Sequence, residues 1–150
     1  MRLTAFTDYT LRTLIYLALR PGELVTIAEI ATAYDVSANH LMKVVHQLAQ
    51  AGDIVTVRGQ RGGLKLARRP EHINIGSVVR RTEPDLALAA CFCGEERCTI
   101  QGQCILAEAL DQAVLAFVRV LESFTLADLT QDTPPLCRLL GITEQDGAAV

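Results

Sequence analysis

The sequence has no apolar run that approaches the roughly 18–20 residues needed to span a bilayer, although half of its residues are hydrophobic. Its first residues also lack the small-residue cleavage site of a signal peptide, and Arg12 interrupts their apolar stretch. We therefore expect a cytoplasmic protein with no membrane partner. Disulfides are rare in that compartment, where clustered cysteines more often bind a metal or react.

Also missing is any C-x-x-C motif, and no histidine that could serve as the base partner of a thiol lies near the cysteines. This argues against a redox or sulfur-transfer enzyme with Cys91 or Cys93 as its nucleophile. The five cysteines are an odd number, which does not suit a closed disulfide framework. Four of them fall in one polar stretch, "ACFCGEERCTIQGQC", between Cys91 and Cys104.

The chain has no overall positive charge, since its net charge is −3, but its basic residues are unevenly distributed. Residues 1–70 carry nine Lys or Arg against five acidic residues, whereas residues 71–150 carry five against twelve. Residues 37–69 contain six basic residues and only one acidic residue. A basic patch confined to one half is typical of phosphate contact, although charge alone fits a solvated surface equally well.

Helical periodicity dominates the N-terminal half. The stretch "TDYTLRTLIYLAL" predicts a helix capped by Thr7 and ended by "RPG". Thr26 and Glu29 then form a T-x-x-E capping box, so a second helix is expected to begin near Ile27. Ser37 is expected to cap a third helix, "ANHLMKVVHQLAQAG". Two short helices joined by a tight turn predict a helix-turn-helix, with an αα-hairpin that has no DNA role as the alternative.

The next stretch, "DIVTVRGQRGGLKLARRP", predicts a β-hairpin. Val55 and Val57 alternate with polar residues, "GQRGG" supplies the turn, and Leu64 and Leu66 alternate again. A basic hairpin directly after a helix-turn-helix indicates a winged helix, whose second helix enters the major groove while the wing contacts the backbone or the minor groove. The expected DNA-binding residues are Ser37, Asn39, His40 and Lys43 on the helix, with Arg58, Gln60, Arg61 and Lys65 on the wing.

The C-terminal half contains a second long periodic segment. The stretch "NIGSVVRRTEP" predicts a short helix that ends at Pro84. After the cysteine loop, the stretch "ILAEALDQAVLAFVRVLESF" predicts a helix of about five turns. One winged-helix core would not cover its wide apolar stripe, so we expect a dimer interface, with packing inside the monomer as the alternative. The stripe consists of Leu106, Leu110, Ala113, Val114, Phe117, Val118, Leu121 and Phe124.

These patterns predict a mainly α fold with a β-hairpin wing: a winged helix-turn-helix followed by a long C-terminal dimerisation helix. The DNA-binding domain is expected over residues 1–82 and the cysteine loop over residues 83–104. The dimerisation helix and a further C-terminal helix, begun by "FTLADL" with Thr125 as its cap, follow over residues 105–140. Residues 141–150 are expected to form a flexible tail.

The cysteine spacing indicates a metal centre without fixing which one. Cys93, Cys98 and Cys104 follow a C-x4-C-x5-C pattern, whereas structural zinc sites favour two short C-x2–4-C pairs. Iron–sulfur clusters suit thiolates spread around a larger object, with a fourth ligand from elsewhere. The three histidines lie in or after the predicted DNA-binding elements and do not suggest themselves as that ligand. Spacing alone leaves a cluster, zinc and free thiols open.

Several stretches together resemble the iron–sulfur winged-helix repressors of the NsrR, IscR and RirA group. They are "MRLTAFTDYTLRTLIYLA", "VSANHLMKVVHQLAQAG", "VRGQRGGLKLA", "INIGSVVRRTEP", the C-x4-C-x5-C loop and "FTLADL", and they extend over roughly residues 1–140. Within the group, "HLMKVV", "INIGSVVRRTEP" and "FTLADL" are most similar to the nitric oxide sensors of the NsrR type.

The resemblance implies a homodimer that binds a palindromic operator, represses nitric-oxide detoxification genes and is released when nitric oxide reacts with its cluster. It implies an iron–sulfur cluster, 4Fe-4S in preference to 2Fe-2S, held by Cys93, Cys98 and Cys104. The fourth ligand would be an oxygen of the "TD" motif, Asp8 of the partner subunit. A simple capping charge on the first helix is the alternative role for Asp8.

The sequence also departs from the group. Some members space their cysteines C-x5-C-x5-C, so Cys91 is a substitute for Cys93 as the first thiolate ligand. The IscR subgroup has a histidine three residues after the third cysteine, where this chain has Ala107, which weakens the IscR interpretation. The alternatives are an iron-sensing or cluster-status regulator of the same group, as in RirA, and a DNA-binding protein with a zinc-stabilised loop.

Overall fold

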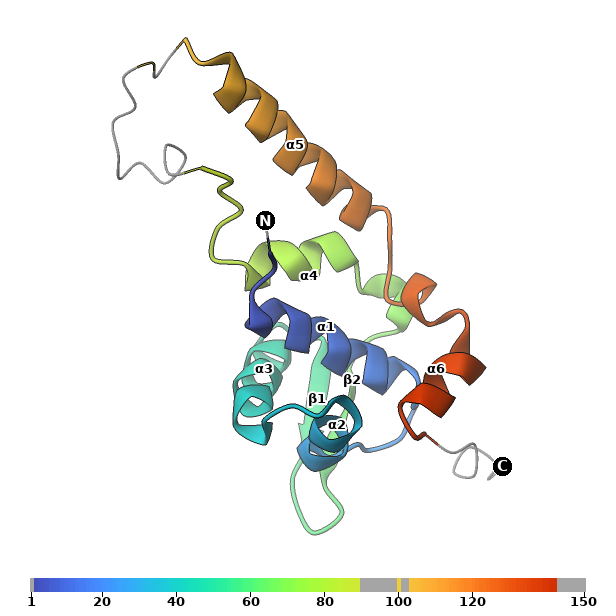
Figure 1. Cartoon of the computed structure of the whole chain (residues 1–150). Helices are drawn as coiled ribbons and strands as arrows, with labels where there is room; N and C mark the ends of the chain where they lie inside the picture. The colour runs from blue at the N-terminus through green and yellow to red at the C-terminus, as the bar shows by residue number, and fades with distance from the viewer. Residues whose placement is uncertain (1, 90–99, 101–102, 143–150) are drawn as a thin grey trace.

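The N-terminal part of the chain forms a winged-helix head, from which one long helix extends (Figure 1). The structure is a computed structural model that describes residues 2–89, 100 and 103–142. Its elements are α1 (Ala5–Ala18), α2 (Ile27–Tyr34), α3 (Ala38–Gln50), β1 (Ile54–Val57), β2 (Gly63–Leu66), the 3-10 turn η1 (Pro70–His72), α4 (Ile75–Thr82), α5 (Ile105–Glu122), the 3-10 turn η3 (Asp128–Thr130) and α6 (Thr133–Leu139).

The core of the head lies where α1 packs on α3, α4 and β2. Leu14 and Leu17 of α1 meet Leu41 and Val44 of α3 there, and all four are almost fully buried. Val45 and Leu48 complete the buried face of α3. The mainly α winged fold with an antiparallel hairpin is confirmed as well.

Of the three N-caps predicted in the head, one is present in full, one is correct in position only, and one is wrong. The capping box of α2 is present, with the Thr26 hydroxyl accepting from the Glu29 N–H and the Glu29 carboxylate accepting from the Thr26 N–H. Ser37 occupies the N-cap position of α3, although its side chain makes no capping bond. Helix α1 begins three residues earlier than a Thr7 cap implies, because Thr4 is its N-cap and accepts from the Thr7 N–H.

The alternation of Val55 and Val57 suggests that their face of β1 is buried, but the structure buries the opposite face. Ile54 is buried and pairs with Leu66, whereas Val55 and Val57 are about two-fifths exposed, at 40% and 43%. Leu64 is buried and pairs with Val25 through two backbone hydrogen bonds of 2.9 and 2.7 Å. The sheet edge at β2 is therefore covered by the segment before α2, while β1 presents its free edge and its valines outward.

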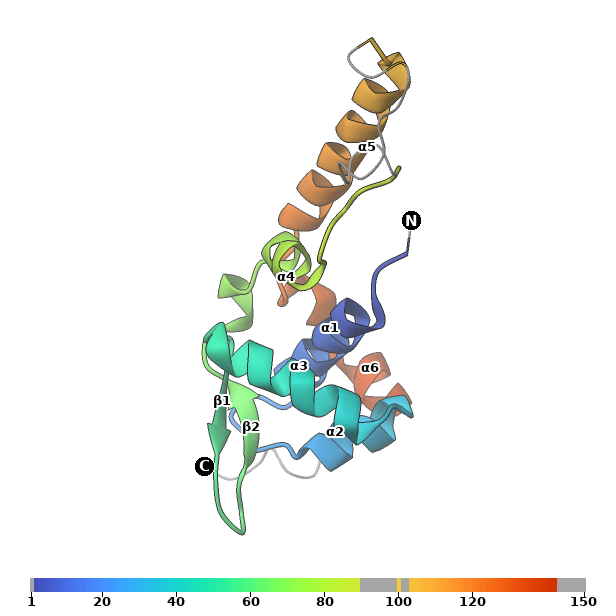
Figure 2. The ribbon, with the colours of Figure 1, turned by 90° about the vertical axis from the view of Figure 1, so that its left-hand side faces the viewer.

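Helix α5 is anchored at its C-terminal end to the start of α4. The Asn74 side chain donates to the carbonyl of Glu122 at 2.7 Å, and the Leu126 N–H donates to the Ile73 carbonyl at 2.8 Å. A Cβ on Gly76 would lie 2.7 Å from the backbone nitrogen of Glu122, so only glycine allows this close approach. From this anchor α5 extends away from the head in both views (Figures 1 and 2).

The C-terminal residues return to the head. Thr125 and Asp128 bind each other reciprocally, as a cap does, but the turn they begin is η3 and the helix proper is α6. The Thr125 hydroxyl and N–H hold the pKa of Asp128 below its usual range. Most of the predicted tail lies outside the described residues. Within the whole described part of the chain, no helix is both long enough and apolar enough to cross a membrane.

Candidate nucleic-acid interface and cysteine loop

The outward face of α3 presents most of the side chains expected to read DNA. Ser37, Asn39 and Lys43 are exposed, because the buried residues of α3 fix the opposite face against α1. Met42 and His46 share this face and are exposed too, Met42 at 52%. Both were missed in the sequence, although they stand three and seven residues after Asn39, the spacing of one helix face.

His40 has a different position from its neighbours. Its ring stacks on Tyr9 of α1, with the ring centroids 6.0 Å apart and the planes at 24°. Although His40 is exposed, this contact turns its imidazole toward α1, at the side of the face centred on Asn39 and Lys43. The stacking suits a role in holding α3 against α1 better than the reading of a base edge.

The hairpin tip carries two arginines and extends beyond the helices of the head (Figure 2). Arg58, Gln60 and Arg61 are exposed on the tip, and Lys65 is half-exposed on β2 opposite Val55. Within the described residues, none of Lys43, Arg58, Arg61 and Lys65 takes part in an ion pair. Their charges are therefore available to phosphate groups.

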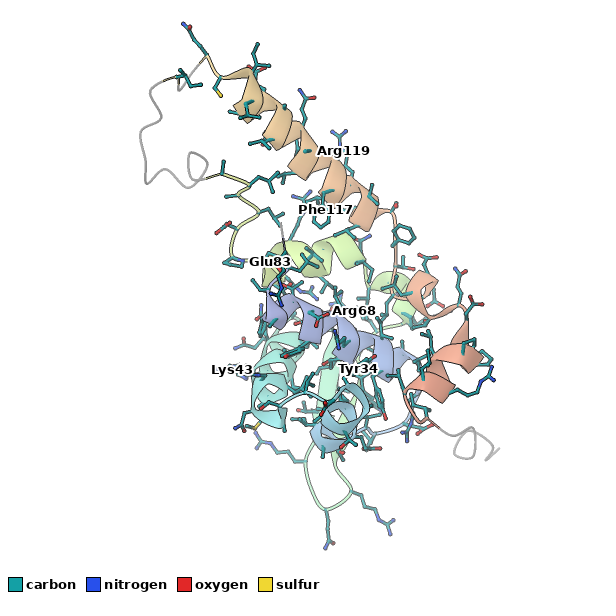
Figure 3. The ribbon with its side chains drawn as sticks, in the orientation of Figure 1. Tyr34, Lys43, Arg68, Glu83, Phe117 and Arg119 are labelled. Atoms are coloured by element: carbon teal, nitrogen blue, oxygen red, sulfur yellow. The ribbon has the colours of Figure 1, made fainter. Side chains whose placement is uncertain are left out.

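The remaining cations of the basic segment are engaged within the protein. Arg68, labelled in Figure 3, donates to the carbonyls of Gly52 and Ala51 at 3.2 and 3.3 Å. Arg69 pairs with Glu71 at 3.4 Å. The count of basic residues in the sequence therefore overstates the charge that is free to bind DNA, because counting cannot separate unpaired arginines from those that already have partners within the protein.

The end of α4 is bonded to the start of α1. The buried Thr7 hydroxyl donates to the Thr82 hydroxyl at 2.9 Å. The Glu83 carboxylate accepts from the Thr4 N–H at 2.8 Å and from its hydroxyl at 3.2 Å (Figure 3). Glu83 is the first residue of the cysteine loop expected over residues 83–104, and these bonds join it to the N-terminus of α1.

Asp8 lies in the first turn of α1 with its carboxylate 3.0 Å from the guanidinium of Arg12. That guanidinium in turn lies 5.6 Å from the ring centre of Tyr34, the last residue of α2. Burial raises the pKa of Tyr34 to about 12, an effect that the Arg12 charge partly offsets. Asp8 is therefore not the N-cap of α1 but one end of a chain of contacts that reaches the turn between α2 and α3.

Three of the loop cysteines, Cys91, Cys93 and Cys98, lie outside the described residues. Cys104 is described as a half-buried free thiol immediately before α5, whose positive N-terminal end favours an anionic ligand group. Cys137 is buried on α6, as an apolar thiol would be. In the part of the chain that is described, no three metal-binding side chains come together. The first turn of α5 and helix α1 lie well apart in both views (Figures 1 and 2).

Comparison with known sequences gives a near full-length match. The pattern of the Rrf2 family, described as an iron-dependent transcriptional regulator, matches residues 3–132. The HTH-type transcriptional regulator NsrR of Bacillus subtilis is 47% identical over 146 residues, covering 96% of this chain and 100% of the relative. NsrR of Halalkalibacterium halodurans is 46% identical over 142 residues, covering 93% of this chain and 97% of the relative.

Solved structures with the same architecture include two regulators. CymR, the global cysteine regulator of B. subtilis, has a TM-score of 0.73 at 26% identity, covering 88% of this chain and 98% of CymR. IscR of T. potens has a TM-score of 0.72 at 25% identity, covering 91% of this chain and 90% of IscR. The shared architecture extends over the winged-helix head and into the C-terminal half.

Proposed function

The chain belongs to the Rrf2 family of transcriptional regulators, as its NsrR-type relatives do, and on that basis we propose that it is a nitric oxide-responsive repressor. It acts in the cytoplasm, as a homodimer on a palindromic operator, and an iron–sulfur cluster in its cysteine loop sets its affinity for that DNA. Since the family consists of transcriptional regulators, the sulfur-transfer enzyme considered from the sequence is set aside.

The observation that carries this proposal is the place of the cysteine loop in the chain. The loop begins at Glu83, whose carboxylate is hydrogen-bonded to Thr4 at the N-terminus of α1. The other end reaches Cys104, which directly precedes α5. A change of structure in the loop therefore acts on the DNA-reading head and on the long helix together.

The donors of this chain fit an iron–sulfur cluster. Cys93, Cys98 and Cys104 would supply soft thiolates, and Asp8 of the partner subunit a harder carboxylate. The described donors suit these roles, because the Cys104 thiol is free and half-buried and the Asp8 side chain is 44% exposed. A bound 4Fe-4S cluster would supply an iron to which nitric oxide binds.

Asp8 also gives the head a way to respond. A carboxylate drawn toward the thiolates of the other subunit leaves the 3.0 Å pairing with Arg12. Arg12 lies over Tyr34, and the helix-turn-helix turn follows directly, so the partners of Arg12 bear on the placement of α3. The two positions of the carboxylate make a two-state element that a ligand at the loop can bias.

The apolar surface of α5 supports the homodimer. In the described chain only Val118 of its 18 residues is buried, while Leu106 and Val120 are 65% and 58% exposed. Alternating steps of four and three residues connect a set that lies along one seam, which is the heptad pattern of helices that pack on one another. The seam consists of Leu106, Leu110, Ala113, Phe117 and Val120 of α5.

The wing gives a prediction about affinity for DNA. Arg61→Ala should make the dependence of log Kobs on log salt shallower by about two units per dimer, since each phosphate contact contributes about 0.9 and the dimer has two wings. Fluorescence anisotropy with a labelled duplex across a salt series measures this slope. Arg138→Ala, which removes the same charge from α6, should leave the slope unchanged. An Arg61→Ala protein with the wild-type slope would mean that the wing does not touch DNA.

The cysteines give a prediction about the metal centre. Cys104→Ala, like Cys93→Ala and Cys98→Ala, should yield colourless protein after anaerobic purification, because each removes one of three thiolates. Cys137→Ala should keep full iron and sulfide content, since its thiol is buried on α6 and packs as a small hydrophobe. Cys91→Ala should keep most of the cluster. Colour retained by Cys104→Ala, or lost by Cys137→Ala, would contradict the ligand set.

A second candidate function is iron sensing by the same centre. The description of the Rrf2 family as iron-dependent favours it. An iron sensor would release DNA when iron is withheld with no nitric oxide present. To separate the two signals, DNA release by an iron chelator is compared with DNA release by nitric oxide in samples that have lost the same fraction of cluster. A response to the chelator alone would favour iron sensing.

A further inference from the structure

The base of the wing contains a buried carboxylate, Asp53, in the middle of the most basic segment of the chain. Its side chain is only 1% exposed. Its N–H donates to the carbonyl of Leu48 in α3 at 3.0 Å, and its carbonyl accepts from the N–H of Ala67 after β2 at 2.8 Å. Asp53 is therefore fixed between α3 and both arms of the hairpin.

Two arginines from different parts of the chain share this carboxylate. Arg81 of α4 donates to one oxygen, and the guanidinium of Arg68, after β2, lies 3.7 Å from the other. Burial lowers the pKa of Arg81, whose side chain is about one-third exposed. A buried carboxylate without cationic partners is strongly unfavourable, so the three charges depend on one another.

Arg81 also binds α3 through its backbone. The side-chain amide of Gln47, in α3, donates to the Arg81 carbonyl at 3.2 Å. Arg81 belongs to the last turn of α4, two residues before the cysteine loop begins at Glu83. One residue beside the loop thus holds both DNA-reading elements, α3 through its carbonyl and the wing through Asp53.

The wing needs such an anchor, because an isolated two-stranded hairpin is only marginally stable in water. On the β2 side, its base is held by the backbone pairing of Leu64 with Val25. On the other side it is held by the contacts of Asp53. The tilt of the wing against α3 therefore depends on where α4 places Arg81.

We propose that Asp53 is a positioning residue that fixes the wing to the end of α4 and thereby passes a change in the cysteine loop to the wing. This inference rests on the proposed function, whose regulated site it extends. Asp53 itself does not touch DNA, and its effect is exerted through Arg81 and the hairpin. The route lies within one subunit and is separate from the contacts of Asp8.

Removing the charge of Asp53 tests the proposal, because the two possible roles of Asp53 predict opposite changes in DNA affinity and in its salt dependence. If Asp53 served only as a local negative charge, Asp53→Asn would remove a repulsive group and free Arg68 and Arg81, so DNA binding would tighten and its salt dependence would steepen. If Asp53 positions the wing, the same variant weakens DNA binding, and the salt dependence becomes shallower because wing cations leave the phosphates.

The experiment uses the full-length dimer, a palindromic duplex selected by the wild-type protein and an unrelated duplex of equal length. The slope of log Kobs against log salt is measured for the wild type, Asp53→Asn and the double variant Arg58→Ala/Arg61→Ala. Leu126→Ala, which truncates a buried side chain outside α3, α4 and the hairpin, is the control for lost stability. Arg81→Lys, which keeps the charge but loses the planar guanidinium, is the second variant should Asp53→Asn fail to fold.

Asp53→Asn should reduce the slope by up to about four units per dimer, as the double variant does at about 0.9 per lost contact in each of two wings. The ratio of operator affinities before and after nitric oxide should fall toward one. Leu126→Ala should lower the thermal midpoint and leave the slope at its wild-type value, and Arg81→Lys should shift the slope in the same direction as Asp53→Asn.

An unchanged or steeper slope in Asp53→Asn would overturn the positioning role. A reduced slope with an unchanged nitric oxide ratio would overturn the transmission from loop to wing. Failure of the proposed function has a different signature, since the wild-type protein would then show no response to nitric oxide. The slopes on both duplexes are measured without nitric oxide, so they would still test what Asp53 does to the wing.

Discussion

Asp8→Ala is expected to abolish most of the difference in operator affinity between cluster-loaded and cluster-free protein, while the variant still binds a cluster. Three thiolates supply most of the affinity for iron, so the colour should remain. The visible spectrum should shift, because one iron exchanges a carboxylate for water or an external ligand. The tie between the subunits through Asp8 is then lost, and the loaded protein should bind the operator about as the cluster-free protein does.

The structure predicts a small cost in stability for this variant. Thr4, not Asp8, caps α1, and the Asp8–Arg12 pair is an exposed i,i+4 ion pair. Such pairs contribute about 0.5 kcal/mol, and a charge near the helix N-terminus adds about as much. A loss of operator affinity that far exceeds a drop of about 1 kcal/mol in unfolding free energy would not be explained by destabilisation.

Arg12→Gln is the matched control, because it breaks the same ion pair and keeps the Asp8 carboxylate. The spectrum, the thermal midpoint and the operator affinity are measured on one anaerobic preparation of each protein. Arg12→Gln should keep the wild-type spectrum. If Asp8→Ala keeps both the wild-type spectrum and full operator affinity, Asp8 is not a ligand, and the fourth position belongs to solvent or to another side chain.

Ala113→Glu is expected to convert the dimer into a monomer and to reduce operator affinity by two or more orders of magnitude. Ala113 is exposed in the single chain and occupies the centre of the heptad seam of α5. A glutamate there should be tolerated by the monomer, where it faces water. At a helix–helix interface it would bury a charge without a partner, which costs several kcal/mol.

The matched control is Gln112→Glu, which adds the same charge one residue earlier, on the side of α5 away from the seam. Analytical ultracentrifugation gives the mass, and circular dichroism checks that both variants keep their helices. Gln112→Glu should remain dimeric and bind DNA normally. A dimeric Ala113→Glu protein would exclude the seam as the interface.

Local signals in the sequence were sufficient to locate most helices and the hairpin of the head. Capping residues, helical periodicity and the glycine-rich turn located α2, α3 and the hairpin, because these features depend on residues close together in the chain. The cap of α1 was misplaced because Thr4 and Thr7 both suit an N-cap, and the choice is made by a distant residue. Glu83 binds the N–H and hydroxyl of Thr4, and Thr82 binds the hydroxyl of Thr7.

The face of the hairpin was not predictable for a similar reason. Ile54 and Val55 are both apolar, and the one that becomes buried is decided by where α1 and α3 pack on the sheet. Likewise, the sequence could not separate the cations free to bind DNA from those that fasten the hairpin. Arg68 and Arg61 look alike in a basic stretch, and only the tertiary position of Asp53 distinguishes them.

The affinity for DNA is proposed to depend on a cluster held by the cysteine loop. The measurement that tests this dependence is anaerobic purification with iron and sulfide counts, followed by operator binding before and after a stoichiometric addition of nitric oxide. We expect coloured protein with equal amounts of iron and sulfide, and operator binding that is tight before the addition and at least tenfold weaker after it. Protein that contains zinc without sulfide, or operator binding that nitric oxide leaves unchanged, would rule out this dependence.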